Sequence, residues 1–482
     1  MGTLKSAYEL GSERIIASGF ARQLEKEETK RKKTEKERLD ALPDFVAAWE
    51  MSQKEESGLE ESIVEDVEKN PTTFISKKLK EESSIVEPED IRRIAVQEPE
   101  TITCNDAMEI HWYGHFTTYS GFSRMNRAMV FGLANRNVRV KVDIQKAAIE
   151  INRSTYRELQ RMESMDVNPS AIKIFGATIP LSMCHGGKKI LYTMMENDQT
   201  LHKEYVERLN LFDEIWVPTK HGERMFKKNG VRPNVLVMPL GVETSRYHSG
   251  IEPMKINDLG KFRFLSVFKW GYRKGYDILL KAYMEEFSSQ DDVSLILVSR
   301  CDTDNNPNRI AEDFKAIRMG IDKADEDLPH ISLYDKKILE KDMPSVYRMG
   351  NAFVLMSRGE GFGLPYYEAA ACGLPIIGSN CSGQSDLLTE ENSYLVDPDD
   401  FVKATINGPL SKLAKHCRFY EDQIFPDFGP NATMKTRKHM REVFENYDAA
   451  IEKAAILQKY VRTNCTWEKA VGKVYNRIRE IT

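Results

Sequence analysis

The chain has 482 residues, which is enough for two or three domains of about 150 residues each. Its 69 basic and 74 acidic side chains leave a net charge of -5, and this balance excludes a general attraction to nucleic acid or anionic membranes. The 7 scattered cysteines, without a Cys-x-x-Cys pair, indicate reduced thiols in a cytoplasmic protein and not a disulfide framework or a zinc site. No apolar run reaches the roughly 18 residues that a transmembrane helix needs.

Residues 1–97 differ from the rest of the chain and are predicted to be a charged, mainly helical N-terminal extension. Between Gln23 and Asp40 nearly every side chain is charged, and both signs recur at helical spacing, which favours a solvated helix. The absence of apolar residues between Leu24 and Leu39 argues against a coiled coil. Two interpretations stay open: an arm for homo-oligomer formation or recruitment, and a mobile, solvated extension.

A first α/β domain is predicted for residues 98–245. A strand beginning at Glu109 runs into a loop with a glycine, Tyr119–Arg124, and a helix is expected over Met125–Asn135. Val138–Val142 alternates apolar and polar residues and predicts the next strand. This order of strand, glycine loop, helix and strand is typical of a doubly wound sheet.

Later in this domain, a buried strand is predicted over Ile190–Met195. Glu196, Asn197 and Asp198 follow it directly. In doubly wound sheets, polar side chains at the carboxyl end of a strand face the ligand crevice. We therefore expect these three residues to border a ligand site.

A second α/β domain is predicted for residues 246–460, beginning with a strand over Phe262–Phe268. The loop after this strand carries Lys269, Arg273 and Lys274 and leads into a helix. Fixed positive charge beside free N–H groups at a helix entrance suits a pyrophosphate.

An Asp-x-Asp motif, Asp302 and Asp304, lies in a loop that is rich in Asn and Pro. We interpret it as an ordinary loop, and no metal site is predicted.

The stretch Ser357–Leu388 organises this second domain. A short buried strand precedes a glycine-rich loop at residues 358–365, and a helix and another strand follow. Glycines let the backbone approach a ligand closely, and the helix entrance favours an anion. Two carboxylates, Glu360 on the loop and Glu368 on the helix, stand eight positions apart. After the second strand lies a loop of small residues at 378–384, whose backbone amides we expect to meet bound phosphate groups.

Glu360, seven intervening residues and Glu368, with Gly-Phe-Gly-Leu-Pro between them, resemble the donor-binding element of retaining glycosyltransferases with the GT-B fold, in their family-4 branch. The resemblance extends over about 109–400. It implies two doubly wound Rossmann-like domains that face a crevice. It also implies that residues 461–482 form a last helix that packs back on the first domain.

The resemblance implies metal-independent transfer of a sugar from a UDP- or GDP-linked donor, with retention of configuration and without a cofactor. The catalytic residues that it implies are Glu360, Lys274 and Lys269. The donor-binding residues are Glu368, Gly361, Phe362, Gly363, Leu364, Arg273, Gly121, Ser379 and Gly383. The residues on the acceptor side are His115, Tyr119, Glu196, Asn197 and Asp198.

The sequence departs from the family pattern in two places. Many members have a histidine where this chain has Glu196–Asp198, and most have an arginine where this chain has Lys269. A lysine keeps the positive charge but loses the two-pronged donor geometry of arginine. Two other functions stay open: a nucleotide-sugar epimerase or hydrolase of the same architecture, and a catalytically inactive nucleotide-sugar-binding module. The acceptor is also open, whether a glycan, a lipid, a protein or a nucleic acid base.

Overall fold

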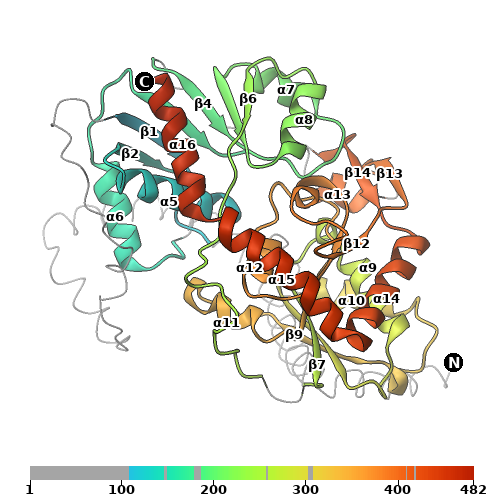
Figure 1. Cartoon of the computed structure of the whole chain (residues 1–482). Coiled ribbons are helices and arrows are strands. Elements are labelled where there is room, and N and C mark those ends of the chain that lie inside the picture. Colours follow the sequence, from blue (N-terminus) through green and yellow to red (C-terminus); the bar gives the residue numbers. More distant parts are fainter. Residues whose placement is uncertain are drawn as a thin grey trace, which may run out of the picture. The chain divides into compact units, whose positions relative to one another are not determined.

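Two six-stranded, fully parallel β-sheets organise the described part of the chain (Figure 1). The computed structural model describes residues 108–145, 149–178, 186–256, 259–301, 308–408, 410–416 and 420–482. The predicted extension, residues 1–97, and the Asp302–Asp304 motif lie outside these ranges. Among the described residues, no helix is both long enough and apolar enough to cross a membrane.

The first sheet has the strand order β2-β1-β3-β4-β5-β6, so the order reverses beside β1. Its strands are β1 (Glu109–Gly114), β2 (Arg139–Ile144), β3 (Ile172–Gly176), β4 (Lys189–Tyr192), β5 (Glu214–Val217) and β6 (Asn234–Val237). Its helices are α5 (Gly121–Ala134), α6 (Arg153–Glu163), α7 (Lys203–Leu209) and α8 (Lys220–Lys228).

The second sheet has the order β12-β11-β10-β7-β8-β9 and reverses between β10 and β7. Its strands are β7 (Phe262–Lys269), β8 (Val293–Arg300), β9 (His330–Tyr334), β10 (Ala352–Leu355), β11 (Ile376–Ser379) and β12 (Tyr394–Val396). Its α-helices are α9 (Tyr276–Glu286), α10 (Arg309–Arg318), α11 (Met343–Tyr347), α12 (Leu364–Ala371), α14 (Pro430–Glu445) and α15 (Tyr447–Asn464). The 3-10 turns are η2 (Tyr272–Lys274), η3 (Asp325–Asp327), η4 (Glu340–Asp342) and η5 (Ser382–Asp386). Strands β13 (Asp400–Lys403) and β14 (Ile424–Asp427) form a separate two-stranded antiparallel sheet, and α13 (Ser411–His416) lies between them in sequence.

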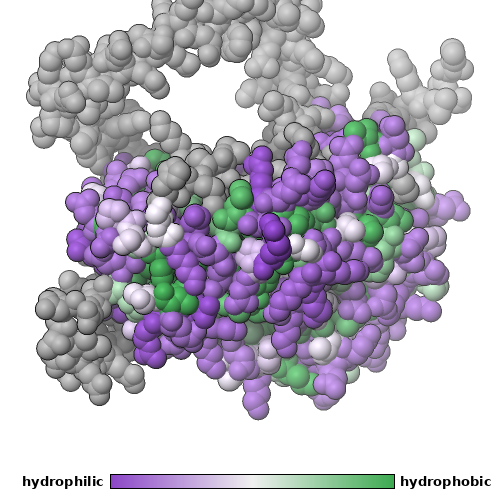
Figure 2. All heavy atoms as spheres, turned by 90° about the horizontal axis from the view of Figure 1, so that it is seen from above, coloured by the Kyte–Doolittle hydropathy of each residue, from purple (hydrophilic) through white to green (hydrophobic). Residues whose placement is uncertain are grey.

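The central strands are apolar on both faces because helices cover both sides of each parallel sheet. All four residues of β10 are buried, and seven of the eight residues of β8 are buried. Hydrophilic residues dominate the face that Figure 2 shows, with hydrophobic ones visible between them. The two parallel sheets, each with a reversal in its strand order, confirm the predicted fold class of two Rossmann-like domains.

Helix α5 begins four residues before the predicted start at Met125. The Ser120 side chain accepts a hydrogen bond from the Ser123 amide at 3.3 Å, and such a cap satisfies an amide that the first helical turn leaves without a partner. The glycine loop therefore supplies the first turn of the helix.

The last helix, α16 (Trp467–Ile481), lies against α5 of the first domain (Figure 1). Val471 packs on Gly132, where a larger side chain would have no room. Arg477 donates to both carboxylate oxygens of the buried Glu214, at 3.0 and 2.6 Å. Helix α16 therefore packs on the first domain, which also contains β1.

Candidate active site

The loops that follow β7 and β10 lie side by side, because these strands are neighbours where the order of the second sheet reverses. Ligands of open α/β sheets bind at the carboxyl ends of the strands at such a point. Gly275 ends the first loop with φ 65°, and a side chain there would overlap the Met356 carbonyl of the second. Only glycine combines this backbone conformation with so close an approach.

A buried ion pair joins the two loops. Lys274 Nζ lies 2.5 Å from Glu360 Oε1, and the two side chains are 12% and 7% exposed. Arg273 Nη1 lies 3.7 Å from the other oxygen of Glu360. Burial pushes the pKa of Glu360 up, but the charges of Lys274 and Arg273 outweigh this and hold its pKa below the ordinary value. Burial, and then the neighbouring Arg273, lower the pKa of Lys274.

Glu196 of the first domain reaches the same cluster from the end of β4. Its Oε1 lies 3.5 Å from Arg273 Nη2, and the Tyr420 hydroxyl donates to its Oε2 at 2.8 Å. Gly359 leaves no room for a side chain against the Glu196 carbonyl. The two domains therefore meet where the predicted donor and acceptor residues lie.

Ser382 bridges the domains through its backbone and side chain. Its hydroxyl contacts the carbonyls of Glu196 and Glu360 at 3.2 and 3.0 Å, and its amide donates to Asp198 Oδ2 at 3.3 Å. The Gly383 amide donates to the Glu360 carbonyl at 2.9 Å. This amide was predicted to meet donor phosphates, and here it holds the glutamate loop in place.

Other predicted donor residues also face inward. Ser379 is fully buried and donates to the Ser357 carbonyl at 2.6 Å. Lys269 ends β7 with an exposed side chain, while the ion pairs of Glu360 are with Lys274 and Arg273. Arg273 therefore lies beside Glu360, and the catalytic role that the resemblance implies for Lys269 stays a prediction.

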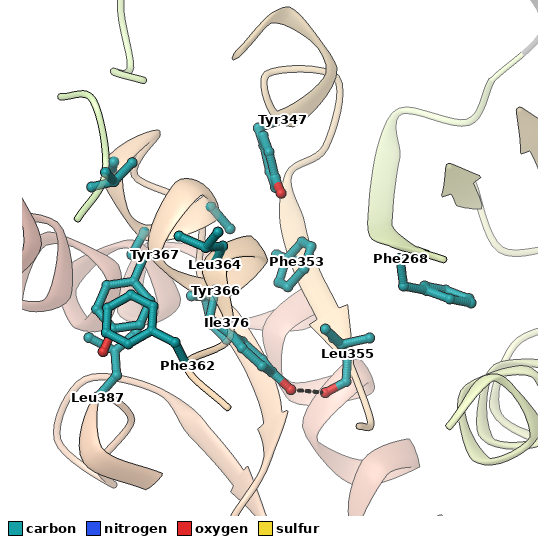
Figure 3. Close-up of a cluster of buried hydrophobic side chains, with 14 of the residues drawn as sticks. Phe268, Tyr347, Phe353, Leu355, Phe362, Leu364, Tyr366, Tyr367, Ile376 and Leu387 are labelled. Carbon is teal, nitrogen blue, oxygen red and sulfur yellow. Dashed lines mark hydrogen bonds between the residues drawn. The ribbon is translucent and has the colours of Figure 1, made fainter. Parts of the chain in front are cut away.

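Helix α12 is anchored by aromatic side chains (Figure 3). Phe362 stacks on Tyr367 with ring centroids 4.0 Å apart, and the Tyr366 hydroxyl donates to the Leu355 carbonyl at 2.6 Å. Gly363 precedes the helix in the left-handed conformation, and Leu364 begins the helix as a buried residue. In the same loop, Gly361 packs against the Met194 side chain. The helix carrying Glu368 is therefore fixed firmly to β10.

Glu368 is buried on α12 and forms an ion pair with Arg124 of α5. The Tyr347 hydroxyl donates to its other carboxylate oxygen at 2.7 Å. Arg124 also lies 3.4 Å from Glu340, which in turn lies 3.1 Å from Arg127. The oxygens predicted to receive a ribose are thus engaged with protein groups in this structure.

Three of the remaining residues predicted for the first domain lie just before or at the start of α5, and Asn197 lies elsewhere. His115 and Gly121 are exposed, and the Tyr119 amide donates to Glu150 at 2.9 Å. Asn197 is fully buried, and its amide group donates to Gln423 Oε1 at 3.3 Å. Asn197 is therefore part of the protein interior, whereas Glu196 belongs to the ion cluster that Arg273, Lys274 and Glu360 form.

Four residues of this region escaped prediction: Arg124, Arg358, Ser382 and Tyr420. A sequence signal pointed to Arg358, because it is a charged residue at the start of the glycine-rich loop at residues 358–365. Arg124 left a weaker one, since it lies three positions after Gly121 in the glycine loop. Tyr420 left none, because its contact with Glu196 joins parts of the chain that are far apart in sequence.

These features define a protein with the GT-B architecture. Residues 261–409 match the family described as glycosyl transferases group 1. In structure, the chain is similar to a sucrose-phosphate synthase from Thermosynechococcus elongatus, with a TM-score of 0.55 and 14% identity over 78% of this chain and 100% of that one. It is also similar to HepE of Anabaena in complex with UDP and glucose, with a TM-score of 0.52 and 11% identity over 77% of this chain and 100% of that one.

Several curated proteins also match in sequence, among them one from rice and one from Corynebacterium glutamicum. Probable sucrose-phosphate synthase 5 of Oryza sativa subsp. japonica is 33% identical over 156 residues, which are 31% of this chain and 15% of the rice protein. A GDP-mannose-dependent monoacylated alpha-(1-6)-phosphatidylinositol monomannoside mannosyltransferase of Corynebacterium glutamicum is 23% identical over 270 residues, which are 50% of this chain and 68% of that protein. The match to the rice protein therefore covers a small part of that relative.

Proposed function

We propose that the protein transfers a sugar from a nucleoside-diphosphate sugar to an acceptor, with retention of anomeric configuration and without a metal ion. One observation carries the proposal. Lys274 and Arg273 meet Glu360 at the reversal point of the second sheet, directly beside Glu196 of the first domain. Fixed cations and a sugar-orienting carboxylate are what departure of a diphosphate from a sugar requires.

In the proposed reaction, the bond between the anomeric carbon and the β-phosphate oxygen breaks, and its electron pair stays on the phosphate. Lys274, Arg273 and the N-terminus of α9 stabilise that charge. The acceptor hydroxyl forms the new bond to carbon and passes its proton to the departing β-phosphate oxygen. Glu360 orients the donor hydroxyls. We name no covalent residue, and retention follows from attack on the face from which the phosphate leaves.

The contact between Glu196 and Arg273 is one that a bound donor can replace. This carboxylate lies 3.5 Å from Arg273 and is 25% exposed, so it is less tightly held than Glu360. A donor diphosphate carries more negative charge than a carboxylate, and it can likewise accept two hydrogen bonds from a guanidinium. We therefore expect the phosphate to replace Glu196 as the partner of Arg273, which leaves Glu196 facing the acceptor.

The nucleoside of the donor is proposed to lie near α12, with its ribose on Glu368. The Anabaena protein binds UDP and the Corynebacterium protein depends on GDP-mannose, so both bases remain in the proposal. Neither relative defines the acceptor. The cytoplasmic location and an oligomer formed through residues 1–97 likewise remain predictions.

The test is calorimetric titration of the full chain with a panel of UDP- and GDP-linked sugars, with UMP and GMP as controls that lack the diphosphate. We expect one diphosphate sugar to bind more tightly than its monophosphate control. Free UDP or GDP that accumulates only when an acceptor is supplied would support transfer, whereas release without an acceptor would indicate a hydrolase. A changed sugar on an intact nucleotide would indicate an epimerase. Binding without turnover would indicate an inactive binding module, and no binding at all would refute the proposal.

A further inference from the structure

Arg358 lies two residues before Glu360 and is 1% exposed. Its Nη1 and Nη2 donate to the two carboxylate oxygens of Asp277, each at 2.8 Å. Nη1 also donates to the Tyr272 carbonyl at 2.9 Å, and the guanidinium carbon lies 3.9 Å from the centre of the Tyr272 ring. Arg358 therefore links the glutamate loop to both ends of the segment that contains Lys274.

The backbones of the two loops are joined at the same place. The Arg358 amide donates to the Arg273 carbonyl at 2.6 Å, and the Ser357 hydroxyl donates to the same carbonyl at 3.3 Å. Asp277 lies in the first turn of α9, three residues after Lys274. A shift of Arg358 relative to Asp277 would therefore change the separation between Lys274 and Glu360.

The position needs an arginine for a physical reason. A planar guanidinium can donate to two carboxylate oxygens and to a carbonyl while its face rests on an aromatic ring, and a lysine ammonium cannot. A buried cation also costs several kcal/mol unless it is fully paired, and Asp277 supplies the opposite charge. The Phe428 ring lies 5.9 Å from the guanidinium as a second aromatic neighbour. The contacts of Arg358 are thus with the protein interior.

We propose that Arg358 is a positioning residue, which acts through Lys274 and Glu360 by fixing the loop after β7 against the loop after β10. The effect on donor binding rests on the proposed function, whereas the effect on Lys274 does not. The structure supplies two ways to break the contact. Arg358→Lys removes the two-pronged donor, and Asp277→Asn removes the charge of the partner but keeps its size, at a side chain that is 24% exposed.

Arg318→Lys is the matched control. Arg318 donates to Asp325 Oδ1 through Nε at 2.9 Å and through Nη2 at 2.6 Å, outside the ion cluster. All three variants of the full chain are compared with the wild type in three measurements. These are the melting temperature, the rate at which an amine-reactive acetylating reagent modifies Lys274 as followed by peptide mass spectrometry, and the affinity for the best-binding nucleotide sugar.

We expect Arg358→Lys and Asp277→Asn to raise the rate of Lys274 modification at least about fivefold, because labelling of a buried group follows its local opening. We expect donor affinity to fall about tenfold or more in the same variants, since small misplacements of binding groups are costly. Arg318→Lys is expected to change neither. If Arg358→Lys does not fold, Asp277→Asn decides.

Unchanged Lys274 labelling in the folded variants would overturn the inference, and so would an equal rise in Arg318→Lys. If the wild type bound no nucleotide sugar, the proposed function would fail. The labelling rates would then still decide whether Arg358 positions Lys274.

Discussion

Arg124 of the first domain and Glu368 of the second form an ion pair across the two Rossmann-like domains. Glu368 is 2% exposed and Arg124 is 18% exposed, so little water screens the pair. Burial pulls the pKa of Arg124 down, but the charge of Glu368 outweighs this and raises it above its ordinary value. Arg124 has Glu340 as a second neighbour at 3.4 Å. The carboxylate predicted to bind the ribose is therefore held by a cation that has another partner within reach.

This relationship gives opposite predictions for the two residues. Arg124→Gln frees Glu368 for the ribose, and we expect nucleotide-sugar affinity to rise about fivefold, equivalent to about 1 kcal/mol. Glu368→Ala removes the ribose contact, and affinity is expected to fall. Calorimetric titration measures both. Arg136→Gln, two residues beyond the end of the same helix and bonded to main-chain carbonyls, is the control. Weaker binding in Arg124→Gln would mean that Arg124 itself belongs to the donor site.

Lys274 is expected to contribute most to stabilising the leaving group. Lys274→Ala removes the cation nearest to Glu360, and we expect kcat/KM to fall by about a hundredfold to a thousandfold, as for the loss of one preorganised donor to developing charge. Steady-state kinetics at saturating acceptor measure the loss. Lys269→Ala is the matched comparison, because the exposed Lys269 is expected to matter far less. An equal fall in kcat/KM in both variants would support the catalytic role that the resemblance implies for Lys269.

The lowered pKa of Glu360 predicts an acid-dependent loss of stability. The unfolded chain binds a proton at this group near its ordinary value of 4.5, and the folded protein binds it only at lower pH. The contribution of Glu360 is therefore complete above that value and is lost as the pH falls through the lowered pKa. Urea denaturation from about pH 7 to pH 3 should show the gap in unfolding free energy between wild type and Glu360→Gln narrowing below about pH 5. The exposed Glu452→Gln is the control, and a gap independent of pH would contradict the assignment.

Activity is expected to survive removal of divalent cations, because Lys274, Arg273 and helix N–H groups are proposed to carry the leaving-group charge. Among the described residues, no three His, Cys, Asp or Glu side chains are grouped as a metal site would need. The measurement is the transfer rate in EDTA against the rate with added Mg²⁺ or Mn²⁺. Activity that disappears in EDTA and returns with either ion would direct attention to Asp302 and Asp304.

Local sequence pattern determined the architecture and part of the site. Buried runs such as Ala352–Leu355 predicted the central strands because helices cover both faces of a parallel sheet. Lys274 and Glu360 were predicted because each follows a strand and precedes a helix, where loops of this fold meet ligands. These inferences needed only neighbouring residues.

Tertiary structure alone decided which side chains meet. Glu196 contacts Arg273, Arg124 contacts Glu368, and Arg358 contacts Asp277, and each pair joins different loops or different domains. Which of several nearby cations reaches a carboxylate depends on strand order, on loop approach at glycines and on side-chain direction. The periodicity and composition of the sequence do not give strand order, the approach of loops or the direction of a side chain. The sequence therefore predicted where charge would gather, and the folded chain places Arg273 beside Glu360 and Arg124 beside Glu368.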